Sequence, residues 1–227
     1  IQQTCSLVIA TYRDDELGSQ HPLRLLLGDL VRHPGVERLG LAPLSLTAVR
    51  QLAQNYRGDV TQLHQMTAGN PFFINQVLIS GEEGIPATVR EVVLGRVSRL
   101  SLSGRAALNA AAVIGQRIEP WLLKAVTQAE ADAVEESLEL GILLVQGDHF
   151  VFRHELARRA ILDQIVPHQR TFWHQAVLDV LKVSPLGQKD LARLAHHAEA
   201  AADKEAILAY APAAARQAEA ARAHRAA

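Results

Sequence analysis

A histidine at position 154 stands where a strand-like pattern changes into a helical one. Phe150 and Phe152 alternate with Val151, which predicts a short strand, and from Leu156 onward the apolar residues recur at helical spacing. His154 is therefore expected in or near the first turn of a helix. The free backbone N–H groups and the positive dipole end of such a turn attract an anion such as phosphate. Two roles stay open from these residues: contact with a phosphate, or capping of the helix.

Arg13 follows a short apolar run, residues 7–11, that is typical of a strand buried on both faces of a parallel sheet. Folds of the α/β class bind ligands just past the carboxyl ends of such strands, where Arg13 is expected. Its guanidinium is suited to hold a terminal phosphate through two hydrogen bonds. A surface ion pair with Asp15 is an equally good interpretation. Asp14 is a poor Mg²⁺ ligand, because at about 3.3 Å per residue it lies roughly 10 Å beyond the strand.

The tripeptide Gly69-Asn70-Pro71 predicts a turn followed by a helix start. Asn70 is the expected cap, and Pro71 suits the first helical position, where no backbone N–H is needed. The functional alternative is that Pro71 and the following Phe72 present an apolar wall to a flat base.

Several kinds of chemistry have no support in the sequence. The phosphate-binding pattern GxxxxGK[ST] is absent, and no lysine follows a glycine, so the chain by itself is not expected to hold and polarise a triphosphate or to be catalytic. There is no GxSxG nucleophile motif. The ten histidines include no HExxH pattern, and His196 and His197 are expected to point to different sides of a helix. No metal site is therefore predicted.

The composition is that of a globular protein, with 48% hydrophobic residues, a net charge of −1 and a calculated pI near 6.9. This charge balance gives no footprint for nucleic-acid binding. No apolar run approaches the roughly 18 residues of a transmembrane helix, so no membrane partner is expected. Cys5 is alone, which excludes an internal disulfide and favours a cytoplasmic location. The chain begins without methionine at a buried-looking strand, so we expect it to be a piece of a longer protein.

Four parts are predicted to position these residues. Residues 1–44 have the order strand, helix (21–33), strand (36–41), which indicates the tail of an α/β domain. Residues 45–84 are predicted to be helical. Residues 85–166 contain helices followed by a hairpin, which is the order of a winged helix, and a capping box at Thr88 is expected to start the first of them. Residues 167–227 are predicted to form an αα-hairpin that begins a helical arm, with Phe172 and Trp173 buried against the winged helix.

Direct DNA contact by the winged helix is not expected. Its recognition helix would lie at about 129–140, which carries five carboxylates: Glu130, Asp132, Glu135, Glu136 and Glu139. These would repel the phosphate backbone.

The order of these motifs resembles that of the signal-transducing STAND ATPases, and most closely the large bacterial regulators of the LuxR and MalT type. The resemblance rests on LVIATYR at 7–13, GNPF at 69–72, the helix at 89–100 and FRHEL at 152–156, and it covers essentially the whole chain. It implies the tail of a P-loop NTPase domain, a helical lid, a winged helix and the start of a tetratricopeptide-like arm. The phosphate loop and magnesium carboxylates should lie upstream, and an output domain downstream.

The resemblance also implies roles for individual residues. Arg13 would be the sensor 1 arginine that reads the γ-phosphate. Pro71, with Gly69 in the family's GxP motif, would pack on adenine, and His154 would contact the β-phosphate of ADP in the resting state. The intact protein would then bind ATP or ADP with Mg²⁺, respond to an unknown inducer and self-associate when active. Its implied function is a nucleotide-switched regulator that controls transcription; a helical interaction scaffold without nucleotide and a DNA-binding adaptor are the alternatives.

Overall fold

The computed structural model describes residues 7–12, 21–81, 85–128 and 131–220. Most of these residues are helical, and their sheet is a two-stranded antiparallel hairpin. This confirms the predicted mainly helical fold class. No helix in these ranges is long and apolar enough to cross a membrane.

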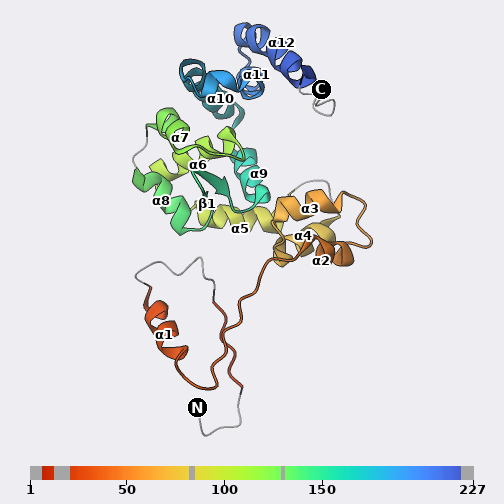
Figure 1. Ribbon diagram of the computed structural model, residues 1–227, viewed down its shortest axis with the longest axis vertical. Helices are drawn as coiled ribbons and strands as arrows, with labels where there is room; N and C mark the ends of the chain where they lie inside the picture. Colours follow the sequence, from red (N-terminus) through yellow and green to blue (C-terminus); the bar gives the residue numbers. More distant parts are fainter. Residues whose placement is uncertain (1–6, 13–20, 82–84, 129–130, 221–227) are drawn as a thin grey trace.

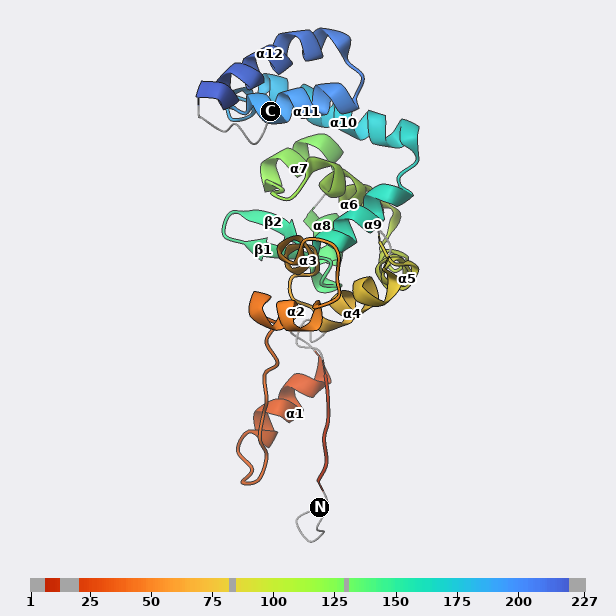
Figure 2. The ribbon, with the colours of Figure 1, turned by 90° about the vertical axis from the view of Figure 1, so that its right-hand side faces the viewer.

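The N-terminal part does not form the strands that the sequence predicts. Helix α1 (Pro22–Leu30) begins after His21, and no residue in it is buried. Residues 7–12 and 36–41 run as extended chain without strand pairing, and Leu7, Ile9, Leu39 and Leu41 are 77–87% exposed. A strand buried on both faces needs hydrogen-bonded neighbours and covering helices, and the described residues supply neither. This part stands apart from the other elements (Figures 1 and 2).

Three short helices follow and form a compact layer. They are α2 (Leu46–Leu52), α3 (Val60–Thr67) and α4 (Pro71–Ser80). Ser45, Asp59 and Asn70 cap them, and each side chain accepts a hydrogen bond from a backbone N–H of the first turn. Their apolar faces form one core cluster, which also takes in a residue from each of two later helices: Val49, Ala53, Leu63, Phe73, Ile74, Val77, Val89 and Leu156. The layer is thereby fastened to α5 and α9.

The middle of the chain is built from helices and the hairpin in the predicted order. The elements are α5 (Ala87–Val97), α6 (Leu102–Ile114), α7 (Pro120–Thr127), α8 (Ala131–Glu139), β1 (Leu143–Gln146), β2 (His149–Phe152) and α9 (Glu155–Gln164). Leu143 pairs with Phe152, and both side chains are buried. Ile118, between α6 and α7, adds an antiparallel bridge to Phe150. The hairpin ends at Phe152, and His154 is at the cap position of α9, which begins at Glu155.

Helix α5 begins differently from the prediction. Its cap position is Pro86, which has no side-chain cap hydrogen bond. The hydroxyl of Thr88 instead donates to the side-chain oxygen of Gln76 on α4, 2.5 Å away. The capping-box prediction was therefore wrong, because Thr88 lies inside the first turn of α5 and its hydroxyl donates to a residue of the preceding helix.

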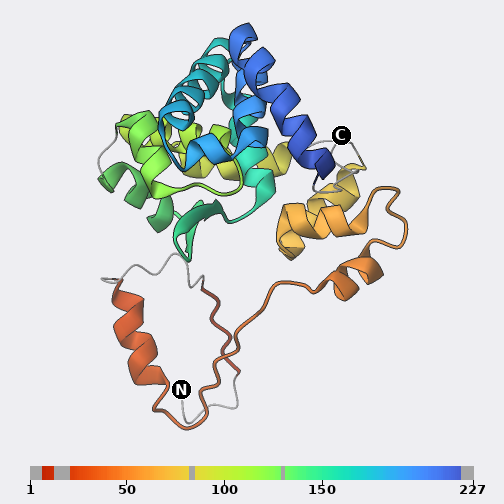
Figure 3. The same cartoon turned by 45° about the horizontal axis from the view of Figure 1, so that its top comes forward.

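The C-terminal helices are α10 (Pro167–Val183), α11 (Leu191–Ala200) and α12 (Lys204–Ala220), with a short 3₁₀ turn (Gly187–Lys189) between the first two. Helix α10 packs on α6 and α7, and α11 packs on both α10 and α12 (Figure 3). Val177, Leu178 and Leu181 of α10 belong to the same core cluster as residues of α6 and α9. These helices therefore share a core with the middle of the chain.

The predicted aromatic joint between the two parts is only half correct. Trp173 is half-buried and packs at the edge of the core cluster, whereas Phe172 is 62% exposed. On a helix the two adjacent positions point about 100° apart, and the buried stripe of α10 runs through Val177, Leu178 and Leu181. Only Trp173 lies close enough to this stripe to reach the core.

Candidate functional site

Gly69 has a structural reason to be glycine. Its φ is +71°, a left-handed conformation that favours residues without a Cβ. A Cβ built on it would meet the backbone oxygen of Leu44 at 2.4 Å. The N–H of Leu44 donates to the Gly69 carbonyl at 2.8 Å. Gly69 thus lets the segment before α2 pass close behind the start of α4.

The next two residues form the predicted helix start. The side-chain oxygen of Asn70 accepts a hydrogen bond from the N–H of Phe72 at 3.0 Å, and Pro71 occupies the first turn of α4. Pro71 and Phe72 are exposed, with Phe72 at 44%, while Phe73 is buried. An apolar pair is therefore open to solvent at the N-terminus of this helix.

His154 occupies the cap position of α9, but its side chain makes no capping hydrogen bond. The half-buried ring instead meets the ring of Phe73 edge-on, with centroids 4.7 Å apart and planes at 84°. Phe73 in turn lies 5.5 Å from Phe72 between ring centroids. A row of three rings thus joins the exposed start of α4 to the start of α9. His154 therefore does not cap α9 through a side-chain hydrogen bond, as the simpler interpretation required.

The first turn of α9 carries a paired carboxylate. Both oxygens of Glu155 accept hydrogen bonds from Arg158, at 2.6–3.1 Å, and another nitrogen of Arg158 donates to the carbonyl of Ala112 at 3.0 Å. The negative charge beside the helix N-terminus is thereby largely balanced by the guanidinium. Among the described residues, this site offers surfaces for binding and positioning and has no nucleophile held by a base.

Of the four predicted site residues, the structure brings Gly69, Pro71 and His154 to adjoining parts of α4 and α9. The fourth, Arg13, lies outside the described residues. A large hollow of the molecule is a groove of about 1120 Å³ over α3, α4 and α9, whose lining includes Tyr56, Arg57, Met66, Leu78, Arg159 and Arg170. None of the three placed residues lines this groove, so the row of rings and the groove are separate features.

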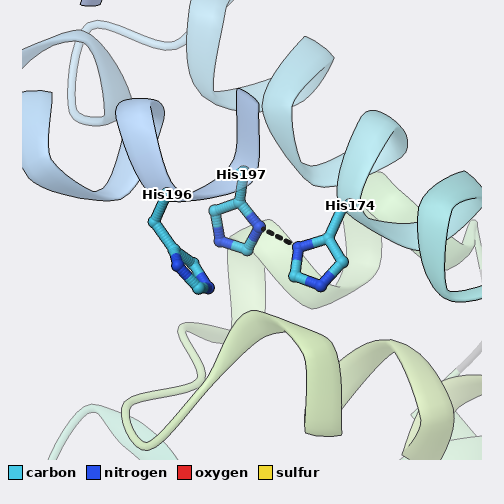
Figure 4. Close-up of side chains that lie close together, drawn as sticks. All are labelled: His174, His196 and His197. Atoms are coloured by element: carbon cyan, nitrogen blue, oxygen red, sulfur yellow. Dashed lines mark hydrogen bonds between the residues drawn. The ribbon is translucent and has the colours of Figure 1, made fainter. Parts of the chain in front are cut away.

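The structure also assembles three histidines that sequence reasoning dismissed. His174 on α10 lies beside His196 and His197 on α11 (Figure 4). The sequence signal was the adjacent histidine pair in one predicted helix and a further histidine in the helix before it. It failed to predict a cluster because only the packing of α10 on α11 brings the three rings together.

Comparison with known proteins gives a structural neighbour. No family model matches the sequence, and no curated protein matches it either. The neighbour is the crystal structure of a signal transduction ATPase with numerous domains (STAND) that has a tetratricopeptide repeat sensor, from Pyrococcus horikoshii. The identity is 17% and the TM-score 0.45, over 77% of this chain and 27% of that chain. The present chain thus spans about a quarter of the neighbour's length.

Proposed function

We propose that residues 1–227 are part of a nucleotide-switched, signal-transducing regulator of the STAND class. The observation that carries the proposal is the ring contact between Phe73 and His154, 4.7 Å between centroids. It ties the helix that starts at Pro71 to the cap position of α9. Two elements that are more than 70 residues apart in sequence, α4 and α9, therefore meet through Phe73, two positions after Pro71, and His154. The motif resemblance assigns Pro71 and His154 to one nucleotide.

In this proposal the four parts keep the roles implied by the motifs. Residues 45–84 act as the lid, 85–166 as the winged helix and 167–227 as the start of the arm. The exposed Pro71 and Phe72 pack on adenine, and His154 contacts the β-phosphate of ADP. Arg13 reads the γ-phosphate, in a nucleotide domain to which residues 1–44 belong. ATP or ADP with Mg²⁺ is the bound group, and the phosphate loop is supplied by residues outside this chain.

In the proposed mechanism, the bound nucleotide sets how the lid and the winged helix are arranged. ADP held between the start of α4 and the start of α9 favours a closed arrangement of lid and winged helix. Exchange for ATP, together with an inducer, favours an open one, because each ligand shifts the equilibrium by its difference in affinity for the two states. Self-association of the open form and control of transcription are the output that we propose.

The test is equilibrium ADP binding by the full-length protein that contains this chain. A charge-assisted hydrogen bond is worth about 1.5–3 kcal/mol, so His154→Ala should weaken ADP binding roughly 10- to 150-fold. His154→Phe keeps a ring against Phe73 but has no N–H, and should show the same loss. His149→Ala, a histidine on the hairpin, is the matched control and should bind ADP normally. Equal affinities for His154→Phe and the wild type would overturn the assignment.

The alternatives predict different results in the same assays. A helical scaffold without nucleotide predicts no saturable ADP binding by the full-length protein. A DNA-binding adaptor predicts tight, salt-dependent duplex binding through α8. That helix carries Asp132, Glu135 and Glu139. Its Glu136 carboxylate accepts hydrogen bonds from the N–H and the hydroxyl of Ser101, at 2.7 and 2.6 Å. A helix that is acidic and held in this way is unsuited to a phosphate backbone.

A further inference from the structure

Three histidine rings gather where α10 and α11 meet (Figure 4). His174 and His197 are buried, with exposed fractions of 7% and 0%, while His196 is exposed. Each ring centroid lies 5.1–5.6 Å from the other two, so the rings form a triangle. One ligand atom from each ring can be chosen so that all lie within 4.8 Å of one another. Within the described residues, these three histidines form a group of potential metal-ligating side chains whose ligand atoms lie close enough together to hold one ion.

Burial disfavours the charged form of the two buried rings. Burial lowers the pKa of His174 to about 4, with the charges of His196 and Arg170 adding to the effect. Burial lowers the pKa of His197 to about 3, with further contributions from His174, His196 and Arg193.

Hydrogen bonding inside the cluster is incomplete. The Nδ1 atoms of His174 and His197 lie 2.9 Å apart, so one donates and the other accepts. The Nε2 of His197 is buried and has no hydrogen-bond partner among the described residues. Whichever tautomer is present, one buried imidazole nitrogen is left unsatisfied, and such groups in native proteins commonly mark an ion or water.

Two positively charged side chains near the cluster, Arg193 and Arg170, are bound to other groups. Arg193 is engaged by both carboxylate oxygens of Glu119, at 2.9 and 3.0 Å, which balances its charge. Arg170 donates to the backbone carbonyl of Leu162. Both guanidinium groups are therefore held by partners of their own.

We propose that His174, His196 and His197 bind a first-row transition-metal ion, with Zn²⁺ as the best-suited probe. Imidazole nitrogen is a preferred ligand of Zn²⁺, and three histidines leave a fourth position for water or another ligand. Tetrahedral Zn–N bonds of about 2.0–2.1 Å place ligand nitrogens roughly 3.3 Å apart. The exposed His196 side chain can rotate to close the present 4.8 Å span. A bound ion would clamp α10 to α11, and so stabilise the start of the arm.

The experiment is a zinc titration of the chelator-treated 227-residue chain, followed by calorimetry and by thermal unfolding. One ion should bind per chain, and the unfolding temperature should rise with zinc concentration. Co²⁺ in place of Zn²⁺ should give the visible absorption bands of a low-coordinate nitrogen site. Absence of saturable binding by the wild type would overturn the proposal.

Two variants assign the binding to these residues. His196→Ala removes an exposed ligand and should leave the fold intact while weakening zinc binding at least about tenfold, since losing even a residue that only supports a metal ligand costs about 10- to 100-fold. His168→Ala removes an exposed histidine from the same helix as His174 and should bind zinc like the wild type. Equal zinc affinities for His196→Ala and the wild type would show that the three histidines do not form the zinc site.

Discussion

At the scale of single residues, Gly69 and His154 have different physical reasons for being there. Gly69 is required by the backbone, since φ is +71° and the carbonyl of Leu44 leaves no room for a Cβ. His154 is not required as a cap, since its side chain makes no capping hydrogen bond and packs on Phe73. The backbone therefore dictates that residue 69 is glycine, whereas capping does not dictate that residue 154 is histidine.

We predict that Gly69→Ala destabilises the chain by about 1–3 kcal/mol, from the strain of a non-glycine residue in this region, with the clash against Leu44 adding to it. Urea unfolding gives the free energy. Gly95→Ala is the matched control, because Gly95 is an exposed helical residue where an added Cβ would meet no atom within 4 Å. Alanine there should be neutral or stabilising by up to about 1 kcal/mol. A Gly69→Ala variant as stable as the control would contradict this explanation.

At the scale of elements, the residue that caps α12 helps to hold the C-terminal helices together. Asp203 precedes α12 and accepts hydrogen bonds from the N–H of Ala206 and from Lys182, both at 3.0 Å. The bond from Ala206, and then the bond from Lys182, lower the pKa of this carboxyl. The folded state therefore binds its proton less readily than the unfolded state. The resulting stability is present at neutral pH and is lost as the pH falls through the ordinary carboxyl range toward the lowered pKa.

Asp203→Ala should accordingly be less stable than the wild type at pH 7, and the difference should shrink below about pH 4, where the unfolded carboxyl is protonated. Asp203→Asn keeps an oxygen that can accept the bond from Ala206 but has no titrating group. It should lose less stability at pH 7 than the alanine variant. Denaturant unfolding at several pH values measures both. A difference that does not change with pH would show that the carboxylate charge contributes nothing.

At the scale of the whole molecule, the C-terminal helices and the middle of the chain depend on one core. Leu178 of α10 is fully buried in the cluster that also contains Leu108 of α6 and Ile161 of α9. Loss of packing in α10 therefore also removes contacts from the middle of the chain. We expect these parts to unfold in one transition.

Leu178→Ala should lower the free energy of unfolding by about 2–5 kcal/mol, the cost of a cavity in a packed core. Phe172→Ala, on the same helix, should change it by no more than about 0.5 kcal/mol because the ring is 62% exposed. Thermal unfolding monitored by circular dichroism tests both variants. Two separate transitions in Leu178→Ala, with only one of them shifted, would show that the C-terminal helices unfold independently of the middle of the chain.

The sequence by itself was sufficient for most of the helical architecture. The Asn70 cap, the proline that follows it and the hairpin within residues 85–166 depend on patterns of a few residues, so local physics predicts them. The two strands near the N-terminus were not formed, because burial on both faces depends on partners that no local pattern supplies. The start of α5 was also wrong, since Thr88 bonds a residue of another helix.

The candidate sites divide in the same way. The sequence pointed to Gly69, Pro71 and His154 because a turn, a helix start and a change of periodicity are local features. Only the tertiary structure brought Phe73, at the start of α4, against His154. The same is true of His174, which lies beside His196 and His197. Helix packing brings together residues such as His174 and His197, 23 positions apart, and that proximity depends on how whole apolar faces fit against one another.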